Sequence, residues 1–176
     1  SQASKGILSE ILEKEELEEK VEYIPHGHYI GSYPETDDDF RDELNIQEED
    51  FVFQFLGQIQ AYKNVELLIK AYQNLDLPQS KLMICGNPAN DELENRLRDL
   101  ITDNNDIIFV SKFIPDEEIV KYLNTADMMV LPYDKSSVLN SGSLFLSLSY
   151  QTPVLIPLIG TAKDLKEQEF VLAYDY

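Results

Sequence analysis

The feature that most constrains the fold is the repeated alternation of short apolar runs with amphipathic segments. Six runs are predicted to be β-strands: FVFQFLG (51–57), KLMICG (81–86), DIIFV (106–110), DMMVLPY (127–133), PVLIP (153–157) and FVLAY (170–174). Strands that are apolar nearly throughout are typical of parallel sheets, because helices cover both faces of such sheets.

The segments between these runs carry apolar residues at helical spacing. The first places Val65, Leu68, Ile69 and Tyr72 on one face of a helix at 65–75. Further helices are predicted at 91–101, 115–124, 141–150 and 161–166. This alternation predicts an α/β domain with a doubly wound, Rossmann-like parallel sheet. Ligands bind such sheets beyond the carboxyl ends of the strands, so the loops of interest are 25–33, 57–64, 86–90, 111–115 and 133–143.

The first third of the chain has a different character. Apolar residues between Ile7 and Leu12 recur at helical spacing among Glu and Lys, which predicts a helix within residues 1–20. A short strand, VEYI (21–24), is expected to follow it. The acidic cluster TDDD (36–39) is predicted to start another helix, because carboxylates stabilise the positive pole of the helix dipole.

Composition and charge limit the classes of partner. The 176 residues, of which 43% are apolar, are enough for one domain with its own core. A formal charge of −19 disfavours nucleic acid and anionic lipid as partners. The single cysteine, Cys85, excludes an internal disulfide; we interpret it as a buried core thiol and expect a reducing, cytoplasmic location.

One region of this acidic chain carries no charge at all. The run from Ser136 to Ala162 is 27 residues long, but its Asn, Gly and Pro residues argue against a membrane span. Hydroxyls and free backbone N–H groups at the helix start near Ser141 and Gly142 could bind phosphate oxygens without adding negative charge. The alternative is that Ser141 or Asn140 is a helix cap and that the following leucines are core.

Lys63 is the second candidate for anion binding. It is the only basic residue between Arg41 and Lys70, and residues 51–65 contain no acid. Lys63 directly precedes a predicted helix, and a cation there is unfavourable unless an anion shares the site. The alternative interpretation is a solvated lysine on a loop.

The loop IPHGHY offers two histidines, His26 and His28. His26 is a candidate hydrogen-bond donor to a sugar or a phosphate, or else a structural or surface histidine. No third or fourth ligand accompanies the pair, so no metal site is expected.

Five segments in this order resemble a known family. They are IPHGHY, FLGQIQAYKNVELLIKAYQNL, KLMICGNP, FIPDEEIVKYLNTADMMVLPY and SGSLFLSLSYQTPVLIP. Together they are similar to the C-terminal, nucleotide-sugar-binding domain of retaining glycosyltransferases with the GT-B fold, the glycosyl transferases group 1 family. The likeness covers nearly the whole chain, and its specificity lies in the order and spacing of the segments.

The resemblance implies roles for individual residues. The donor diphosphate is expected between two groups of residues: Gly57, Gln58 and Lys63 on one side, and Asn140, Ser141, Gly142 and Ser143 on the other. Phe113 and Ile114 correspond to the turn that contacts the nucleobase, and His26 and Lys63 are the expected catalytic residues. No metal or cofactor is expected, because lysine and the helix dipole stabilise the leaving diphosphate.

The chain also departs from the family pattern. Gln58 and Gln60 stand where family members commonly have arginine, and Val138 and Leu146 stand where they commonly have two glutamates. A subset of the family has a Ser-Gly helix start instead, which Ser141 and Gly142 resemble. These departures favour an alternative function, a noncatalytic GT-B-like module that supports a partner glycosyltransferase subunit.

The resemblance also implies a domain organisation. Residues 1–20 are expected to be a helix from a domain junction, and residues 21–176 a donor-binding domain truncated at its C-terminal end. The missing N-terminal domain would bind a glycan or lipid-linked acceptor in polysaccharide biosynthesis, so this chain is expected to be inactive by itself. The full-length protein is expected in the cytoplasm, peripheral to the inner face of the plasma membrane. A flavodoxin-like signalling domain is disfavoured, because no aspartate ends an early strand.

Overall fold

The computed structural model describes residues 22, 24–102, 104–134 and 140–175. These residues form a six-stranded sheet in the order β3-β2-β1-β4-β5-β6, and every neighbouring pair of strands is parallel. The strands are β1 (Phe51–Leu56), β2 (Ser80–Cys85), β3 (Ile107–Val110), β4 (Met128–Val130), β5 (Val154–Pro157) and β6 (Val171–Tyr174). The predicted doubly wound α/β fold and its six strands are confirmed.

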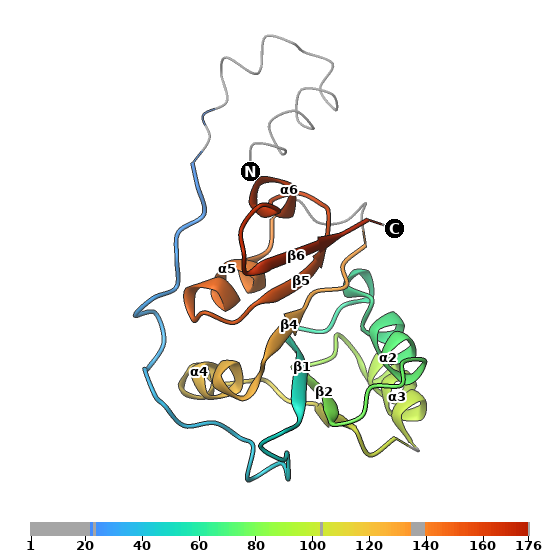
Figure 1. Cartoon of the computed structure of the whole chain (residues 1–176). Helices are drawn as coiled ribbons and strands as arrows, with labels where there is room; N and C mark the ends of the chain where they lie inside the picture. The colour runs from blue at the N-terminus through green and yellow to red at the C-terminus, as the bar shows by residue number, and fades with distance from the viewer. Residues whose placement is uncertain (1–21, 23, 103, 135–139, 176) are drawn as a thin grey trace.

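Helices cover the sheet from both sides (Figure 1). They are the short 3-10 helix η2 (Ala61–Lys63) and the helices α2 (Val65–Gln73), α3 (Asp91–Ile101), α4 (Asp116–Thr125), α5 (Gly142–Ser149) and α6 (Ala162–Leu165). In Figure 1, α2 and α3 lie on one side of the sheet and α4 and α5 lie on the other. The five predicted helices are therefore present, with ends that differ by one or two residues.

The order of the strands reverses between β1 and β4. The chain runs outward from β1 through β2 to β3, and then returns to place β4 on the other side of β1. In open α/β sheets, ligands bind outside the carboxyl ends of the strands at such a switch point. A ligand is therefore expected at the carboxyl ends of β1 and β4 and at the loops that follow them.

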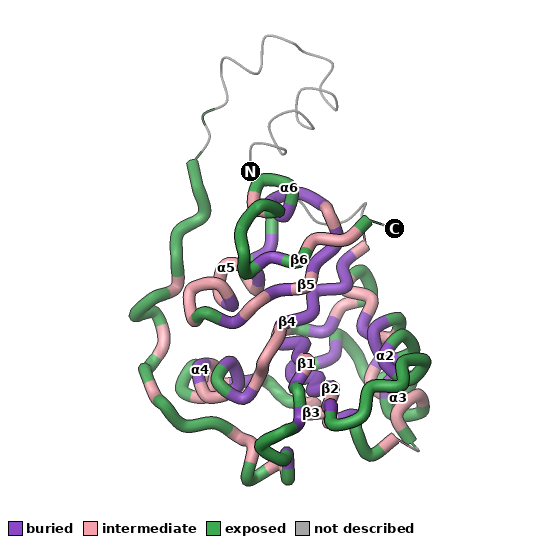
Figure 2. The backbone as a smooth tube through the Cα atoms, in the orientation of Figure 1, coloured by how far each residue is buried: buried purple, intermediate pink, exposed green. Residues whose placement is uncertain are grey.

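The central strands form the core. Phe55 of β1 and Met83 and Ile84 of β2 have no exposed surface, and Leu144 of α5 is equally buried in the same core. Figure 2 shows this burial along the middle strands, whereas the segment that precedes β1 is mostly exposed. The apolar patterns identified in the sequence thus correspond to elements covered on both faces.

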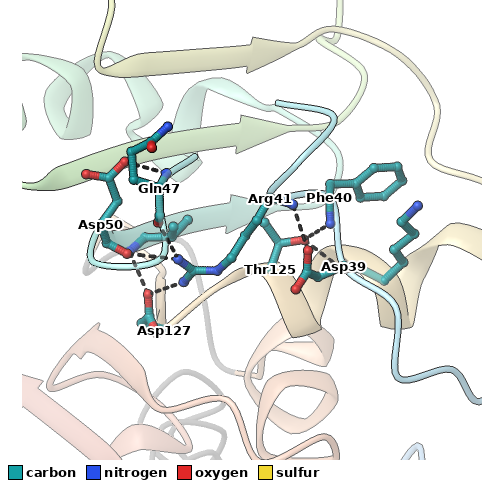
Figure 3. Close-up of polar contacts among 9 residues, drawn as sticks. Asp39, Phe40, Arg41, Gln47, Asp50, Thr125 and Asp127 are labelled. Carbon is teal, nitrogen blue, oxygen red and sulfur yellow. Dashed lines mark hydrogen bonds and ion pairs between the residues drawn. The ribbon is translucent and has the colours of Figure 1, made fainter. Parts of the chain in front are cut away.

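An ion-pair network fastens the segment before β1 to the amino edge of the sheet (Figure 3). The Arg41 guanidinium lies 2.7 Å from the Asp127 carboxylate, which directly precedes β4, and donates to the backbone carbonyls of Gln47 and Asp50 at 3.2 and 3.0 Å. The same Asp127 oxygen accepts a hydrogen bond from the backbone N–H of Val52 at 2.8 Å. Arg41 and Asp127 therefore join this segment to the first residues of both central strands.

Two local predictions for this segment are wrong. The TDDD cluster forms turns rather than a helix start, because the Thr36 hydroxyl accepts the Asp38 N–H at 3.0 Å and the Asp39 carboxylate accepts the Arg41 N–H at 2.8 Å. Such local side-chain bonds favour turns over helices. Glu22 and Ile24 belong to no strand, and Ile24 is 80% exposed, so the described half of the predicted strand at 21–24 is not a strand; residues 21 and 23 lie outside the described residues. The helix predicted for 1–20 lies outside the described residues.

Candidate functional site

Gly57, the residue directly after β1, is the point at which two functional candidates meet. A Cβ atom at Gly57 would lie 3.8 Å from the Lys63 Nζ and 3.5 Å from the Ser143 hydroxyl. Lys63 ends η2 and Ser143 belongs to the first turn of α5. The structure thus brings together the loop after β1 and the helix that follows β4, at the carboxyl edge where the strand order reverses.

The loops after β1 and β2 pack backbone against backbone. A Cβ atom at Gly86 would overlap the carbonyl oxygen of Gly57, and Gly86 also has a φ of +150°. Hydrogen bonds from Gly57 N–H to the Cys85 carbonyl at 2.9 Å and from Gly86 N–H to the Val110 carbonyl at 3.0 Å hold both loops on the sheet. Only glycine fits at Gly86 without moving the Gly57 loop.

The Lys63 ammonium lies among aromatic rings. Its Nζ is 5.8 Å from the ring centroid of Phe55 and 6.0 Å from those of Tyr62 and Tyr133. Burial lowers the pKa of Lys63, and in the described part of the chain no carboxylate forms an ion pair with it. Cation–π contact compensates only part of the lost hydration. An anion at this position would restore the balance of charge.

Tyr133 links Lys63 to the start of α5. Its ring lies beside the Lys63 ammonium, and its hydroxyl lies 3.1 Å from the Ser141 hydroxyl. Tyr133 is only 3% exposed. Burial raises the pKa of Tyr133, while its hydrogen bonds to Ser141 and Ser143 act in the opposite direction. Tyr133 ends the predicted strand 127–133 and begins the loop 133–143 that was singled out in the sequence, but no role of its own was predicted for it.

Some polar groups at the start of α5 are hydrogen-bonded within the fold, and others have no described acceptor. The Ser141 hydroxyl accepts the Leu144 N–H at 3.2 Å and caps the helix, as the structural interpretation expected. The Asn140 side chain accepts a hydrogen bond from Thr161 at 2.6 Å. The backbone N–H groups of Gly142 and Ser143 have no acceptor among the described residues, so they are available to an anion at the positive end of the helix.

A cavity of about 370 Å³ is lined by Gly57 and by no residue of α5. Phe113 and Ile114 line it together with Gln58 and Asn87. Phe113 is 75% exposed and Ile114 is 7% exposed, so Phe113 offers its ring to a ligand while Ile114 anchors the turn in the core. The residues proposed for a diphosphate and for a nucleobase are thus adjacent, with Gly57 between them.

His26 lies beside α5. Its ring stacks on Phe145, with centroids 4.4 Å apart and an interplanar angle of 3°. Its Nδ1 is 2.7 Å from the carbonyl oxygen of Gly27. The exposed His26 ring therefore stands one helical turn from the α5 start.

Of the two positions where family members commonly have glutamate, Leu146 is partly buried in the core, and Val138 lies outside the described residues.

Two further features concern metals and membranes. Among the described residues, no group of three or more His, Cys, Asp and Glu side chains is arranged to hold a metal ion. None of the helices in the described ranges has the length and apolar character needed to cross a bilayer. Cys85 is buried, and that burial raises the pKa of its thiol.

Comparisons with known sequences agree with this architecture. The model of the family "Glycosyl transferases group 1" matches residues 36–139. A GDP-mannose:glycolipid 4-beta-D-mannosyltransferase of Xanthomonas campestris pv. campestris is 28% identical over 138 residues, which cover 76% of this chain and 36% of that protein. Another sequence with this name and organism is 30% identical over 101 residues, covering 57% and 28%. The chain thus spans about a third of the length of these relatives.

Solved structures share the fold. Sucrose-phosphate synthase from Thermosynechococcus elongatus superposes with a TM-score of 0.71 at 20% identity, over 86% of this chain and 39% of that chain. HepE of Anabaena, in complex with UDP and glucose, gives a TM-score of 0.70 at 20% identity, over 88% and 43%. The family match covers more than half of the chain. The protein therefore belongs to the glycosyl transferases group 1 family, and its six-stranded parallel sheet is a Rossmann-like domain of the GT-B type.

Proposed function

We propose that this domain binds a nucleoside diphosphate sugar at the carboxyl edge of its sheet. The observation that carries the proposal is the convergence of the Lys63 ammonium and the Ser143 hydroxyl on Gly57, with no carboxylate paired to Lys63 among the described residues. A diphosphate is the group that such a site suits. It would accept hydrogen bonds from Lys63 and from the open N–H groups at the start of α5.

The neighbouring cavity suits the base of the same ligand. It adjoins Gly57, is lined by the exposed Phe113 ring and the buried Ile114, and has Gln58 and Asn87 as polar neighbours. An aromatic face beside a few polar groups is a common arrangement for a heterocyclic base. The relatives in sequence are named for GDP-mannose, whereas the HepE structure holds UDP, so GDP-mannose is the first donor to test.

In the reaction, Lys63 would act on the leaving group. As the glycosidic bond to the diphosphate breaks, negative charge builds up on its oxygens. A fixed ammonium and fixed N–H groups stabilise that charge without reorganisation. His26, beside α5, would face the sugar or the acceptor. A second domain would supply the acceptor site for a glycan or lipid-linked sugar in polysaccharide biosynthesis, and we propose transfer with retention at the anomeric carbon.

Calorimetric titration tests donor binding directly. The wild-type chain is titrated with GDP, UDP, GDP-mannose and UDP-glucose, and the measurement is repeated with Lys63→Ala. Saturable binding that is weakened in this variant supports the proposal. Lys70→Ala is the control, because it removes an exposed lysine from α2 and changes the net charge equally.

The absence of any nucleotide response from folded protein would contradict donor binding. That result would favour the alternative of a noncatalytic module that supports a partner subunit, to which Gln58 and Leu146 also point. In the full-length protein, NMR of the anomeric proton of the first-formed product distinguishes retention from inversion.

A further inference from the structure

Tyr29 lies along α5 with its backbone fixed at the far end of that helix. Its N–H donates to the Ser149 hydroxyl at 2.9 Å, and its carbonyl accepts a hydrogen bond from the Tyr150 hydroxyl at 3.0 Å. Ser149 ends α5 and Tyr150 is its C-cap. These two bonds hold the Tyr29 backbone at the C-terminal end of the helix.

The side chain of Tyr29 reaches back to the beginning of the same helix. Its hydroxyl oxygen lies 3.1 Å from the position that a Cβ atom on Gly142 would occupy. Gly142 is the first residue of α5, so glycine leaves room there for the phenol. The Tyr29 hydroxyl forms no hydrogen bond with any residue that the structure describes, although a phenol both donates and accepts.

The two sides of the α5 start therefore differ. Ser143 faces Gly57 and Lys63, whereas Gly142 faces the Tyr29 hydroxyl. The cavity lined by Phe113 adjoins Gly57, and none of its lining residues belongs to α5. A ligand that crosses the start of α5 from this cavity reaches Lys63 first and Tyr29 last.

We propose that the Tyr29 hydroxyl donates a hydrogen bond to a hydroxyl oxygen of the sugar carried by the bound nucleoside diphosphate. This inference rests on the proposed function and assigns the sugar end of the donor to the Tyr29 side of α5. A neutral phenol matches a neutral sugar hydroxyl, while the cation lies on the diphosphate side. The His26 ring, 5.6 Å from the Tyr29 ring and stacked on Phe145, forms the adjoining wall.

The experiment compares two ligands that differ only in the sugar. Affinities for GDP and GDP-mannose, or for UDP and UDP-glucose if wild-type protein prefers uridine, are measured by calorimetry for the wild-type chain and for Tyr29→Phe. The lost hydrogen bond is expected to weaken binding of the nucleotide sugar by about 3- to 10-fold and to leave binding of the nucleoside diphosphate unchanged.

Two further variants separate this contact from packing. Tyr33→Phe removes a hydroxyl from the ring that stacks on Tyr29 at 6.2 Å, and it should change neither affinity. Gly142→Ala keeps the backbone N–H but places a methyl group against the Tyr29 hydroxyl, so it should weaken binding of the nucleotide sugar more than binding of the nucleoside diphosphate. Thermal unfolding of each variant checks that the fold is retained.

The outcomes are distinguishable. Equal weakening of both ligands by Tyr29→Phe would overturn the assignment to the sugar, because the hydroxyl would then serve the diphosphate or the fold. No change with either ligand would overturn the contact itself. If the wild-type chain binds no nucleotide, the proposed function fails before any variant is made, and the inference about Tyr29 falls with it.

Discussion

Arg41 and Lys63 are two partly buried cations at opposite edges of the same sheet, and their surroundings differ. At the amino edge, the Arg41 guanidinium is paired with Asp127 at 2.7 Å and bonded to two backbone carbonyls. At the carboxyl edge, the Lys63 ammonium faces three aromatic rings, and no described carboxylate pairs with it. The Arg41 guanidinium thus has a counter-charge and backbone acceptors within the fold, whereas the Lys63 ammonium has no counter-charge among the described residues.

This difference distinguishes a cation that stabilises the fold from a cation that is available to bind a ligand. A partly buried cation that has a counter-charge and protein acceptors stabilises the chain segments that it joins. A desolvated cation without a counter-charge costs stability, and such a cost is common where a site is built for a ligand. The comparison predicts that removing the Arg41 cation lowers stability and leaves binding unchanged, whereas removing the Lys63 cation lowers binding and does not cost stability.

The largest effect is expected from Gly86→Ala. The new methyl group would overlap the Gly57 carbonyl oxygen, and the φ of +150° at Gly86 is strained for alanine. We expect a loss of more than about 3 kcal/mol in the free energy of unfolding, measured by urea denaturation. Gly31→Ala is the control, because Gly31 has a φ of +76° but nothing within 4 Å of its Cβ position. A loss no larger than that of the control would show that the close packing of the two loops is not important.

Lys63→Ala is expected to weaken nucleoside diphosphate binding by about 10- to 100-fold, the worth of a charge-assisted hydrogen bond. Lys63→Met should weaken binding similarly and raise the free energy of unfolding by roughly 0.5–1 kcal/mol, because an apolar side chain replaces a desolvated charge. Calorimetry and urea denaturation measure the two effects. A variant that lost both binding and stability would contradict the contrast with Arg41.

Arg41→Ala is expected to lower stability and to leave nucleotide binding unchanged. Its removal leaves Asp127 and two carbonyls without their donor, so we expect a loss of about 1.5 kcal/mol in the free energy of unfolding. Nucleotide affinity should not change, because this network lies at the other edge of the sheet (Figure 3). Lys121→Ala is a matched control, since Lys121 is about as exposed as Arg41 but its ammonium pairs with the solvent-exposed Glu43. A loss of nucleotide affinity in Arg41→Ala would remove the distinction between the two edges.

The sequence predicted the sheet well because its signals are local. Each strand is an apolar run, such as 51–57, and each helix repeats apolar residues at helical spacing, such as 65–75. The segment 21–50 was predicted poorly, since its conformation depends on distant partners. Arg41 is fixed by Asp127, and the Tyr29 backbone is fixed by α5.

The site was only partly predictable for the same reason. Lys63 and the start of α5 were noticed because charge is missing around them in the sequence. Tyr29 and Tyr133 carry no such signal, because tyrosine is ordinary in both cores and loops. Their positions depend on packing across α5 and across the switch between β1 and β4, which no short pattern encodes.

Tyr133→Phe tests whether a hydroxyl positions the two halves of the site. The variant keeps the ring beside Lys63 but removes the hydrogen bond to Ser141 at 3.1 Å. We expect about a 5-fold loss in nucleoside diphosphate affinity and about 1 kcal/mol in the free energy of unfolding. Tyr62→Phe is the control, because that ring also lies near Lys63 while its hydroxyl bonds no described residue. If both variants behave alike, Tyr133 acts only through its ring.

The smallest effect is a dependence of binding on pH. Burial lowers the pKa of Lys63 below its usual value of 10.5, so in the free protein this lysine loses its proton at a lower pH than in the unfolded chain. Between these two pKa values the unfolded chain binds more protons, and the Lys63 contribution to stability therefore increases with pH.

A bound diphosphate favours the charged form of Lys63, so binding in that pH range should take up a proton, and nucleotide affinity should fall as pH rises. Burial raises the pKa of Tyr133, which moves its ionisation to higher pH. Calorimetry in buffers of different ionisation enthalpy measures the proton uptake, and Lys63→Met should abolish it. Affinity that stays constant as pH approaches 10.5, with no proton uptake, would mean that Lys63 does not meet the diphosphate.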